Sequence, residues 1–170
     1  MRERILDALA PTTYRRFLVY VMGPYKAHDR PDGEMFRFLA GVRDGLREAG
    51  LNAFLATDVG VELDEMDAGT QSIEFARASN AVVFVVPSGG KNLGVGIETG
   101  AVLEDLRERA PERVLVVHEA DVRSAMLGAV ADRWDAAIRS YETREELTRA
   151  VRLFARDVMR REGDGELERP

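Results

Sequence analysis

The chain has 170 residues, 45% of them hydrophobic and 32% charged, which is typical of one globular domain with a sizeable core. Its formal net charge of −6 argues against nucleic acid as a partner, because binding a phosphate backbone needs clustered lysine and arginine. With no cysteine and only two histidines, His28 and His118, it lacks a disulfide framework and a zinc-type cluster, so we expect no metal and no cofactor.

The longest apolar runs have only the length of strands, so we expect no membrane-spanning segment and no membrane as a partner. The first residues, MRERILDALAP, lack the hydrophobic region of a signal peptide. Both observations predict a cytoplasmic protein.

The N-terminal part contains a predicted helix, a strand and a long loop. A short amphipathic helix is expected at Ile5–Leu9, before Pro11, and the apolar run Phe17–Met22 predicts the first strand. After the turn at Gly23 and Pro24, the polar segment YKAHDRPDG is long enough to fold over a bound molecule. We predict that this segment is a lid.

A helix, a strand and a second helix follow the loop. Apolar residues recur at helical spacing from Phe36 to Ala49, and Gly50 is placed to end that helix. The second strand is predicted at Asn52–Thr57. After an acidic loop, Thr70–Ala78 is predicted to form a short helix.

The third strand leads into a glycine-rich loop. Ala81–Val86 is apolar throughout, as expected for a strand covered on both faces of a parallel sheet. Glycines after the strand let backbone N–H groups approach a ligand closely; these are Gly89, Gly90, Gly94 and Gly96. A helix is expected from about Val95 to Arg109, with Glu98 in its first turn.

The last part of the chain predicts two more strands. Arg113–Val117 and Ala136–Tyr141 are the fourth and fifth strands, and Val122–Trp134 between them is expected to contain one short helix. Thr143 and Glu146 form a capping box that opens the last helix. The buried face of this helix is predicted to contain Leu147, Val151, Phe154 and Val158.

Strands that alternate with helices imply right-handed crossovers and a parallel sheet. We predict an α/β fold, a three-layer doubly wound five-stranded parallel sheet of the flavodoxin- or Rossmann-like type with strand order 2-1-3-4-5. Residues 1–162 form this single domain, and residues 163–170, apolar only at Leu167, are expected to be a frayed tail. In this order strands one and three are neighbours, and ligands bind in the crevice at their carboxyl ends.

Two loops with lysine are expected to meet in that crevice. Lysine occurs only at Lys26, after the first strand, and at Lys91, after the third. Their positions favour a phosphorylated or otherwise anionic ligand.

Glu98 has two explanations at this point. The positive end of a helix dipole favours a carboxylate by roughly 0.3–1 kcal/mol, with no chemical role implied. However, Gly94, Gly96 and Gly100 surround it, and each interior glycine lowers helix propensity by about 1 kcal/mol. The glycines therefore indicate that something lies close to this backbone.

A resemblance to a known family favours the chemical explanation. Asn92–Ala101, NLGVGIETGA, resembles the helix-opening motif of the nucleoside 2-deoxyribosyltransferase superfamily, especially the branch that hydrolyses 2′-deoxynucleoside 5′-monophosphates. Val19–Pro24, VYVMGP, resembles the first strand and turn of that family. The resemblance implies an N-glycosidase or 2-deoxyribosyltransferase whose partner is a small-molecule nucleoside or nucleotide.

The resemblance also assigns roles to residues. The glutamate of the motif attacks the anomeric carbon of the sugar, so it implies that Glu98 is the nucleophile. Tyr20 matches a strand tyrosine that orients the nucleophile, although a core aromatic residue would have the same pattern. The expected substrate-binding residues are Gly23, Pro24, Lys26, Ser88, Gly89, Gly90, Lys91, Asn92, Gly94 and Gly96.

The sequence departs from the family pattern at two positions. Asn92 replaces the aspartate of the transferases and the serine of the hydrolases, which hold the 5′ end of the ligand. Ser72 occupies the position of the hydrolases' aspartate, which acts on the base or leaving group. Glu74 or Asp67 could substitute for it, but surface charge is the simpler interpretation.

Other interpretations remain open. One alternative is a catalytically silent module that binds or senses a nucleotide, and a weaker one is an NAD-cleaving enzyme, by analogy with toll/interleukin-receptor-like hydrolases of a related fold. Asp58 and His118 are expected to be satisfied by local hydrogen bonds rather than to act in the site. Because members of the resembling family commonly form dimers or rings, a homodimer or larger homo-oligomer is expected, with Val102 and Leu106 as contact residues.

Overall fold

The computed structural model describes residues 1–24, 33–88, 93–107, 111–122, 130, 133–134 and 136–170. All strands of its five-stranded sheet are parallel and lie in the order β2-β1-β3-β4-β5, which confirms the predicted fold class. The strands are β1 (Tyr14–Met22), β2 (Leu51–Phe54), β3 (Ala81–Val86), β4 (Val114–Glu119) and β5 (Ala137–Tyr141).

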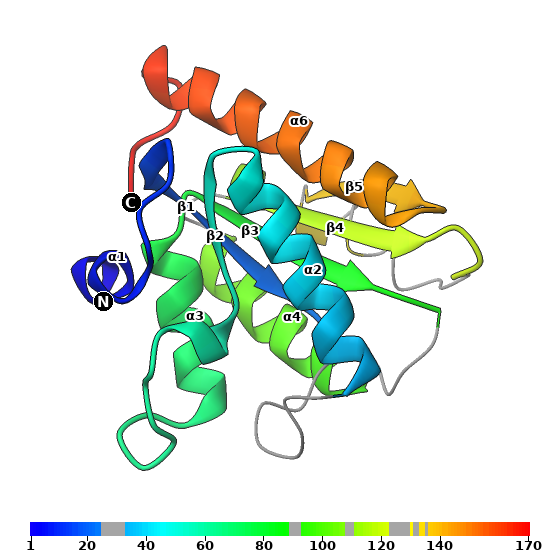
Figure 1. Cartoon of the computed structure of the whole chain (residues 1–170), viewed down its shortest axis with the longest axis horizontal. Coiled ribbons are helices and arrows are strands. Elements are labelled where there is room, and N and C mark those ends of the chain that lie inside the picture. The colour runs from blue at the N-terminus through cyan, green and yellow to red at the C-terminus, as the bar shows by residue number, and fades with distance from the viewer. Residues whose placement is uncertain (25–32, 89–92, 108–110, 123–129, 131–132, 135) are drawn as a thin grey trace.

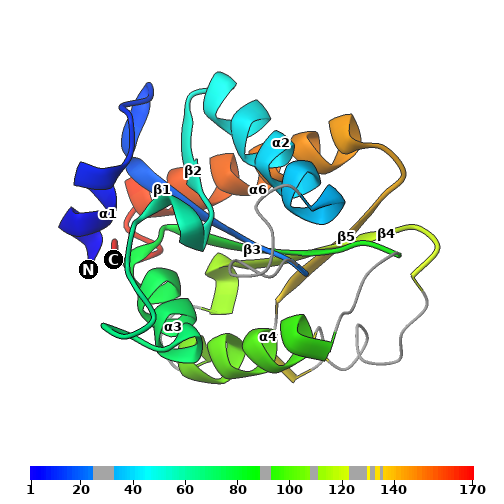
Figure 2. The same cartoon turned by 60° about the horizontal axis from the view of Figure 1, so that its bottom comes forward.

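Helices cover both faces of the sheet. Helices α2 (Glu34–Glu48) and α6 (Arg144–Gly163) lie on one face, and α3 (Ala68–Ala78) and α4 (Leu93–Leu106) lie on the other (Figures 1 and 2). The short α1 (Arg2–Ala8) packs Ile5 and Leu6 into the core on the α3 and α4 side. None of the helices in the described part of the chain is long and apolar enough to cross a bilayer.

Alternation along β1 divides the core into two layers. Phe17, Val19 and Val21 belong to the cluster beneath α2 and α6. Leu18, Tyr20 and Met22 belong to the cluster beneath α3 and α4. Because successive side chains point to opposite faces of a strand, both faces of this interior strand are buried.

Local hydrogen bonds explain why some elements begin or end differently from the prediction. Strand β2 ends at Phe54 because the next residues form a 3-10 turn, in which Asp58 Oδ2 accepts a hydrogen bond from the Leu55 N–H at 2.8 Å. Helix α3 begins at Ala68 because Asp67 Oδ1 accepts from the Thr70 N–H at 3.0 Å. Gly50 ends α2 with a left-handed φ of 91°, as expected.

The start of α6 follows half of the predicted capping box. Thr143 Oγ1 accepts from the Glu146 N–H at 3.2 Å, but the Glu146 carboxylate accepts from Glu142 N rather than Thr143 N. The buried residues of α6 are Leu147, Val151, Ala155 and Val158, while Phe154 is only partly buried. Most of the predicted helix Val122–Trp134 lies outside the described residues.

Part of the C-terminal tail, expected to be frayed, packs against the domain in the described structure. The Glu166 N–H donates to Arg161 O at 2.8 Å, and Leu167 is 9% exposed within the core cluster beneath α2 and α6. Arg113 also donates to the backbone oxygen of Glu168. One apolar residue and one long-range arginine contact therefore hold the segment against the domain.

The two residues of α4 that were expected to form a dimer contact are not on the surface. Val102 and Leu106 are buried in the core of their own chain, together with Leu103. These side chains are not available to a second copy.

A buried polar network lies near the amino ends of the strands. Arg113 pairs with Glu162, and its guanidinium also donates to Asn80 O at 2.8 Å. The Asn80 side chain donates to both carboxylate oxygens of Glu162, at 2.9 and 3.0 Å, and accepts from the Leu18 N–H at 2.9 Å. The network ties β1, β3, β4 and α6 together.

Candidate functional site

The carboxyl ends of β1 and β3 lie side by side, where the sequence places the ligand. In the register of these strands Met22 pairs with Phe84, so the Gly23–Pro24 turn follows β1 next to the last residues of β3. In an open parallel sheet the crevice at such a switch point is the usual ligand site.

Gly23 is needed for packing at this end of the sheet, whether or not a ligand is present. A Cβ atom at this position would lie 2.8 Å from Leu39 Cδ1 and 3.3 Å from the Val85 carbonyl oxygen. Only glycine lets Leu39 of α2 approach the ends of β1 and β3 this closely. The sequence motif alone did not reveal this packing role.

Tyr20 is a core aromatic residue. It is 2% exposed, its ring stacks on Phe54 with centroids 5.0 Å apart, and it meets Phe75 edge-on at 5.7 Å. Such ring pairs stabilise a core by about 0.5–1.5 kcal/mol beyond the burial of area. Its ring belongs to the cluster that also includes residues of α4, the helix that carries Glu98. That its hydroxyl orients Glu98 stays a prediction.

Helix α4 begins at Leu93, earlier than predicted, which moves Glu98 into its second turn. The first turn contains no acidic residue. Because the dipole effect falls off within the first turn, it explains less of the position of Glu98 than expected. The side chain of Glu98 lies outside the described part of the structure.

Gly94 and Gly96 lie in the first turn of α4. The first N–H groups of a helix have no partner within it, and they point toward the positive end of the dipole. Glycines without Cβ atoms leave these N–H groups open to close approach, which suits an anion. Lys26, Gly89, Gly90, Lys91 and Asn92, also predicted to bind substrate, lie outside the described residues.

Ser88, another predicted ligand residue, contacts a carboxylate at the end of the neighbouring strand. Its N–H and its hydroxyl both donate to Glu119 Oε2, at 2.7 and 2.5 Å. These hydrogen bonds hold the pKa of Glu119 below its usual value. Glu119 was not assigned a role from the sequence; the available signal was an acidic residue at the carboxyl end of β4, the strand beside β3.

Tyr141 ends β5 next to Glu119. The two residues pair in the register of β4 and β5, and the Tyr141 ring stacks on Phe38 of α2 at 6.4 Å. Tyr141 is 4% exposed, yet its hydroxyl has no hydrogen-bond partner among the described residues. Burial, assisted by the charge of Glu119, raises the pKa of Tyr141 to about 12. A buried hydroxyl of this kind is a group that a ligand or water can satisfy.

Ser72, which replaces the family's acid, and the two possible substitutes for that acid all have other partners. The hydroxyl of Ser72 is buried and donates to the Ala68 carbonyl at 2.9 Å. Asp67 caps α3 through Thr70, and Glu74 pairs with Arg77 at 2.9 Å. The structure therefore places no carboxylate from α3 in an evident leaving-group position.

Asp58 and His118 are held locally, as expected. Asp58 accepts from Arg43 at 2.6 Å in addition to the Leu55 N–H. His118 Nδ1 lies 2.9 Å from the Glu119 carbonyl oxygen. Within the described ranges, no group of three or more histidine, aspartate or glutamate residues is arranged to hold a metal ion.

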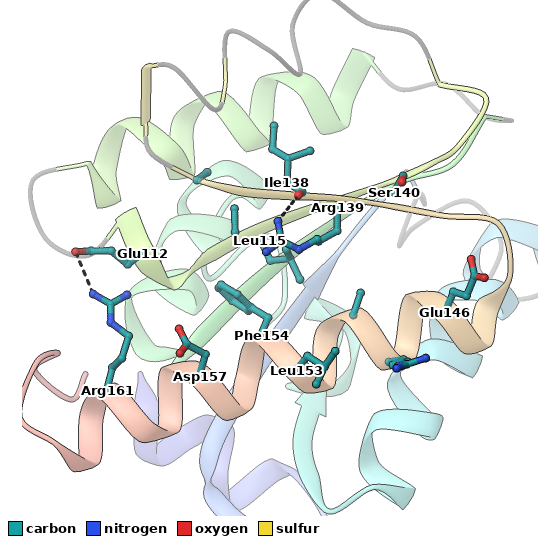
Figure 3. A pocket seen from close by; sticks show the side chains of 14 residues that line it. Glu112, Leu115, Ile138, Arg139, Ser140, Glu146, Leu153, Phe154, Asp157 and Arg161 are labelled. Atoms are coloured by element: carbon teal, nitrogen blue, oxygen red, sulfur yellow. Dashed lines mark hydrogen bonds and ion pairs between the residues drawn. The ribbon is translucent and has the colours of Figure 1, made fainter.

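A groove of about 870 Å³ lies elsewhere, between β5 and α6 (Figure 3). None of the predicted site residues lines it. We place the candidate site at the carboxyl ends of β1 and β3, because the groove lacks the glycine loop and the helix start that suit a small anionic ligand.

Several solved structures share the fold at low sequence identity. A flavodiiron core from Synechocystis sp. PCC6803 aligns with a TM-score of 0.54 and 15% identity over 88% of this chain, which spans 38% of that one. The SEFIR domain of IL-17 receptor B aligns with a TM-score of 0.53 and 17% identity over 84% of this chain and 96% of its own. A diflavin flavoprotein A3 from Nostoc sp. aligns with a TM-score of 0.52 and 13% identity over 92% and 99% of the two chains.

These likenesses show the flavodoxin-like fold and nothing more specific, since fold alone does not establish activity. No curated protein sequence matches the chain. A family model described as a domain of unknown function, DUF7509, matches residues 2–32 and 28–170, and so nearly the whole sequence. The chain therefore belongs to the DUF7509 family.

Proposed function

We propose that this protein binds a nucleoside or its 5′-monophosphate at the carboxyl ends of β1 and β3 and cleaves its N-glycosidic bond, with Glu98 as the nucleophile. The observation that carries the proposal is the glycine-framed glutamate near the start of α4, in a motif that resembles that of nucleoside 2-deoxyribosyltransferases. Such a carboxylate can attack the anomeric carbon while the base departs.

Two features of the described structure support this proposal. Gly94 and Gly96 lie in the first turn of α4, where the N–H groups have no partner within the helix and suit a phosphate. Glu98 lies one turn further on, beyond the part of the helix where the dipole alone accounts for a carboxylate. The resemblance in sequence supplies the chemistry, and the helix start supplies a place for the anion.

A second candidate is a binding module of the same fold that does not turn over its ligand. Ser72 favours it, because this residue stands where the resembling hydrolases have an acid and its hydroxyl is bonded to the Ala68 carbonyl. Without a group that protonates the leaving base, cleavage loses a contribution of about 10²–10⁴-fold.

The proposal is tested by incubating the protein with deoxynucleosides, ribonucleosides, their 5′-monophosphates, NAD and FMN, and measuring both binding and released base. We include FMN because two of the solved structures with this fold are a flavodiiron core and a diflavin flavoprotein. Base release from a nucleoside or a monophosphate supports the proposal. Tight binding of a nucleotide without base release supports the binding module. Release of nicotinamide from NAD, with no base released from the other ligands, supports an NAD-cleaving enzyme.

The variant Glu98→Gln tests the role of the nucleophile. If the carboxylate attacks carbon, turnover falls at least about a thousandfold, equivalent to roughly 4 kcal/mol of transition-state stabilisation, while ligand binding persists. Glu104→Gln, an exposed change on the same helix, is the matched control and should keep activity. If Glu98→Gln retains turnover within a few-fold of the parent, Glu98 is not the nucleophile.

A further inference from the structure

The groove between β5 and α6 lies on a face of the molecule that no other described element covers. Ala137, Ile138, Arg139 and Ser140 of β5 line one side, and residues of α6 including Leu153, Phe154 and Asp157 line the other (Figure 3). Strand β5 is at the edge of the sheet and pairs only with β4 among the described strands. An edge strand presents unpaired backbone groups to a partner.

Leu153 is the exposed apolar residue of this face. Its exposed fraction is 54%, and the partly buried Phe154 lies next to it in the sequence. The buried residues of α6, including Val151 and Ala155, point to the sheet, so Leu153 faces away from the core of its own chain. A leucine at this position gains from a partner that removes it from water.

The charges along α6 are arranged symmetrically around Leu153. Arg149 and Asp157 each lie four positions from it, and Glu146 and Arg160 each lie seven positions from it. Spacings of three and four residues place all five side chains on one face of the helix. At each distance, one member of the pair is acidic and the other is basic.

This pattern is complementary to itself when two copies of the helix are antiparallel. A two-fold axis at Leu153 places Arg149 opposite the second copy's Asp157, and Glu146 opposite the second copy's Arg160. Each pairing occurs twice, as a two-fold interface requires. In the single chain these groups are exposed, and the contacts of Arg160 with Asp157 and Asp164 are short-range surface pairs that stabilise little.

We propose that this face is the interface of a symmetric homodimer, in which α6 of each copy packs antiparallel on α6 of the other, with Leu153 at the two-fold axis. The inference does not depend on the proposed activity. It replaces the α4 contact expected from the sequence, whose apolar residues Val102 and Leu106 are buried.

Sedimentation and light scattering over a micromolar concentration series test the proposal. The parent is expected to dimerise, and added salt is expected to weaken the dimer because it screens the charge pairs. Leu153→Glu should shift the dimer to monomer while circular dichroism stays unchanged. Leu63→Glu, which alters another exposed leucine far from α6, is the control and should leave the dimer intact.

Charge reversal distinguishes this arrangement from other dimers. Arg149→Glu and Asp157→Arg each create two repulsive pairs in the homodimer, so each should weaken association at least about tenfold. An equimolar mixture of these two variants should form a heterodimer. In that heterodimer the introduced glutamate of one chain faces the introduced arginine of the other, and the unchanged Asp157 faces the unchanged Arg149. The double variant Arg149→Glu/Asp157→Arg should dimerise again.

A parent protein that stays monomeric throughout the concentration series overturns the proposal. A dimer that is insensitive to Leu153→Glu also overturns it, since the two-fold axis is then elsewhere. If the single charge variants weaken the dimer but neither their mixture nor the double variant restores it, the antiparallel register is wrong.

Discussion

Buried polar groups at the two ends of the sheet differ in whether they have hydrogen-bond partners. At the amino end, Arg113 and Glu162 have side chains that are each 5% exposed, and both have several partners, including Asn80. At the carboxyl end, the Tyr141 hydroxyl is buried without a partner in the described part of the chain. Ser88, which is exposed, donates a hydrogen bond to Glu119, which is partly buried. At the amino end the buried polar groups bond to one another, whereas the carboxyl end keeps polar groups that a ligand can contact.

This difference agrees with the general behaviour of open α/β sheets, in which ligands bind at the carboxyl ends of the strands. It also predicts that substitutions at the amino end change stability and leave ligand binding unaffected. Substitutions at the carboxyl end should have smaller effects on stability and larger effects on binding.

The largest loss of stability is expected from Arg113→Ala. It leaves Glu162 buried without its cation, which should lower the free energy of unfolding by about 3–5 kcal/mol. Urea denaturation measures the change, and Arg16→Ala, which removes an exposed arginine, should cost at most about 1 kcal/mol.

A double variant sharpens this prediction. Arg113→Met/Glu162→Leu removes both charges, so it should be more stable than Arg113→Ala. If Arg113→Ala costs no more than Arg16→Ala, the amino-end network does not stabilise the fold.

The second prediction concerns pH and Tyr141. Its pKa is raised to about 12, so the protonated hydroxyl is favoured in the folded state. The corresponding stability is fully present below the unfolded pKa of about 10 and is lost as the pH rises through about 12. The loss amounts to roughly 2–3 kcal/mol. Tyr141→Phe should remove this part of the pH dependence, measured as the free energy of unfolding between pH 9 and pH 12 by the same denaturation assay, an interval set by those two pKa values.

Ultraviolet titration of tyrosinate gives an independent check. The parent should show a tyrosine that ionises well above the usual pKa of about 10, and Tyr141→Phe should lose that contribution. A parent in which every tyrosine ionises near its usual pKa of about 10 contradicts the predicted burial.

The third prediction concerns the turn after β1. Gly23→Ala places a methyl group against the end of the Leu39 side chain, and the crowding should cost about 1–2 kcal/mol. Leu39→Ala leaves a cavity when made alone, but in the double variant it also makes room for the new methyl group. The two changes together should therefore cost less than the sum of the single changes, as a double-mutant cycle would show.

The sequence predicted the elements whose pattern is local. Strand β3 begins and ends where predicted, because an apolar run buried on both faces is followed directly by Pro87. The parallel order follows from the alternation of strands and helices. Boundaries that depend on a single hydrogen bond were predicted less accurately. An example is the end of β2, where Asp58 accepts a hydrogen bond from the Leu55 N–H.

Long-range contacts could not be predicted from local pattern. The local sequence around Leu167 does not indicate that Arg113 donates a hydrogen bond to the backbone oxygen of Glu168. The bond between Ser88 and Glu119 joins two strand ends that are 31 positions apart, and it becomes visible only when β3 and β4 are paired. The glycines and Glu98 of the candidate site were proposed from the sequence, which gave no sign that Glu119 lies next to Ser88.

The smallest expected effect concerns that carboxylate. Glu119 occupies the N–H and the hydroxyl of Ser88 at the start of the glycine loop, and its lowered pKa keeps it charged at neutral pH. A phosphate that approaches these donors must compete with the carboxylate and meets its repulsion. Glu119→Gln weakens the hydrogen bonds and removes the charge, so affinity for a 5′-monophosphate should rise by roughly three- to tenfold.

The matching nucleoside, which has no phosphate, should bind Glu119→Gln and the parent about equally. Calorimetric titration of both ligands measures the difference, with Glu145→Gln as a control that removes one exposed negative charge at the start of α6. An equal gain for nucleoside and monophosphate would mean that Glu119 does not compete with the phosphate. A loss for both ligands would instead make Glu119 a direct ligand contact, and the carboxyl end of β4 would then belong to the binding site itself.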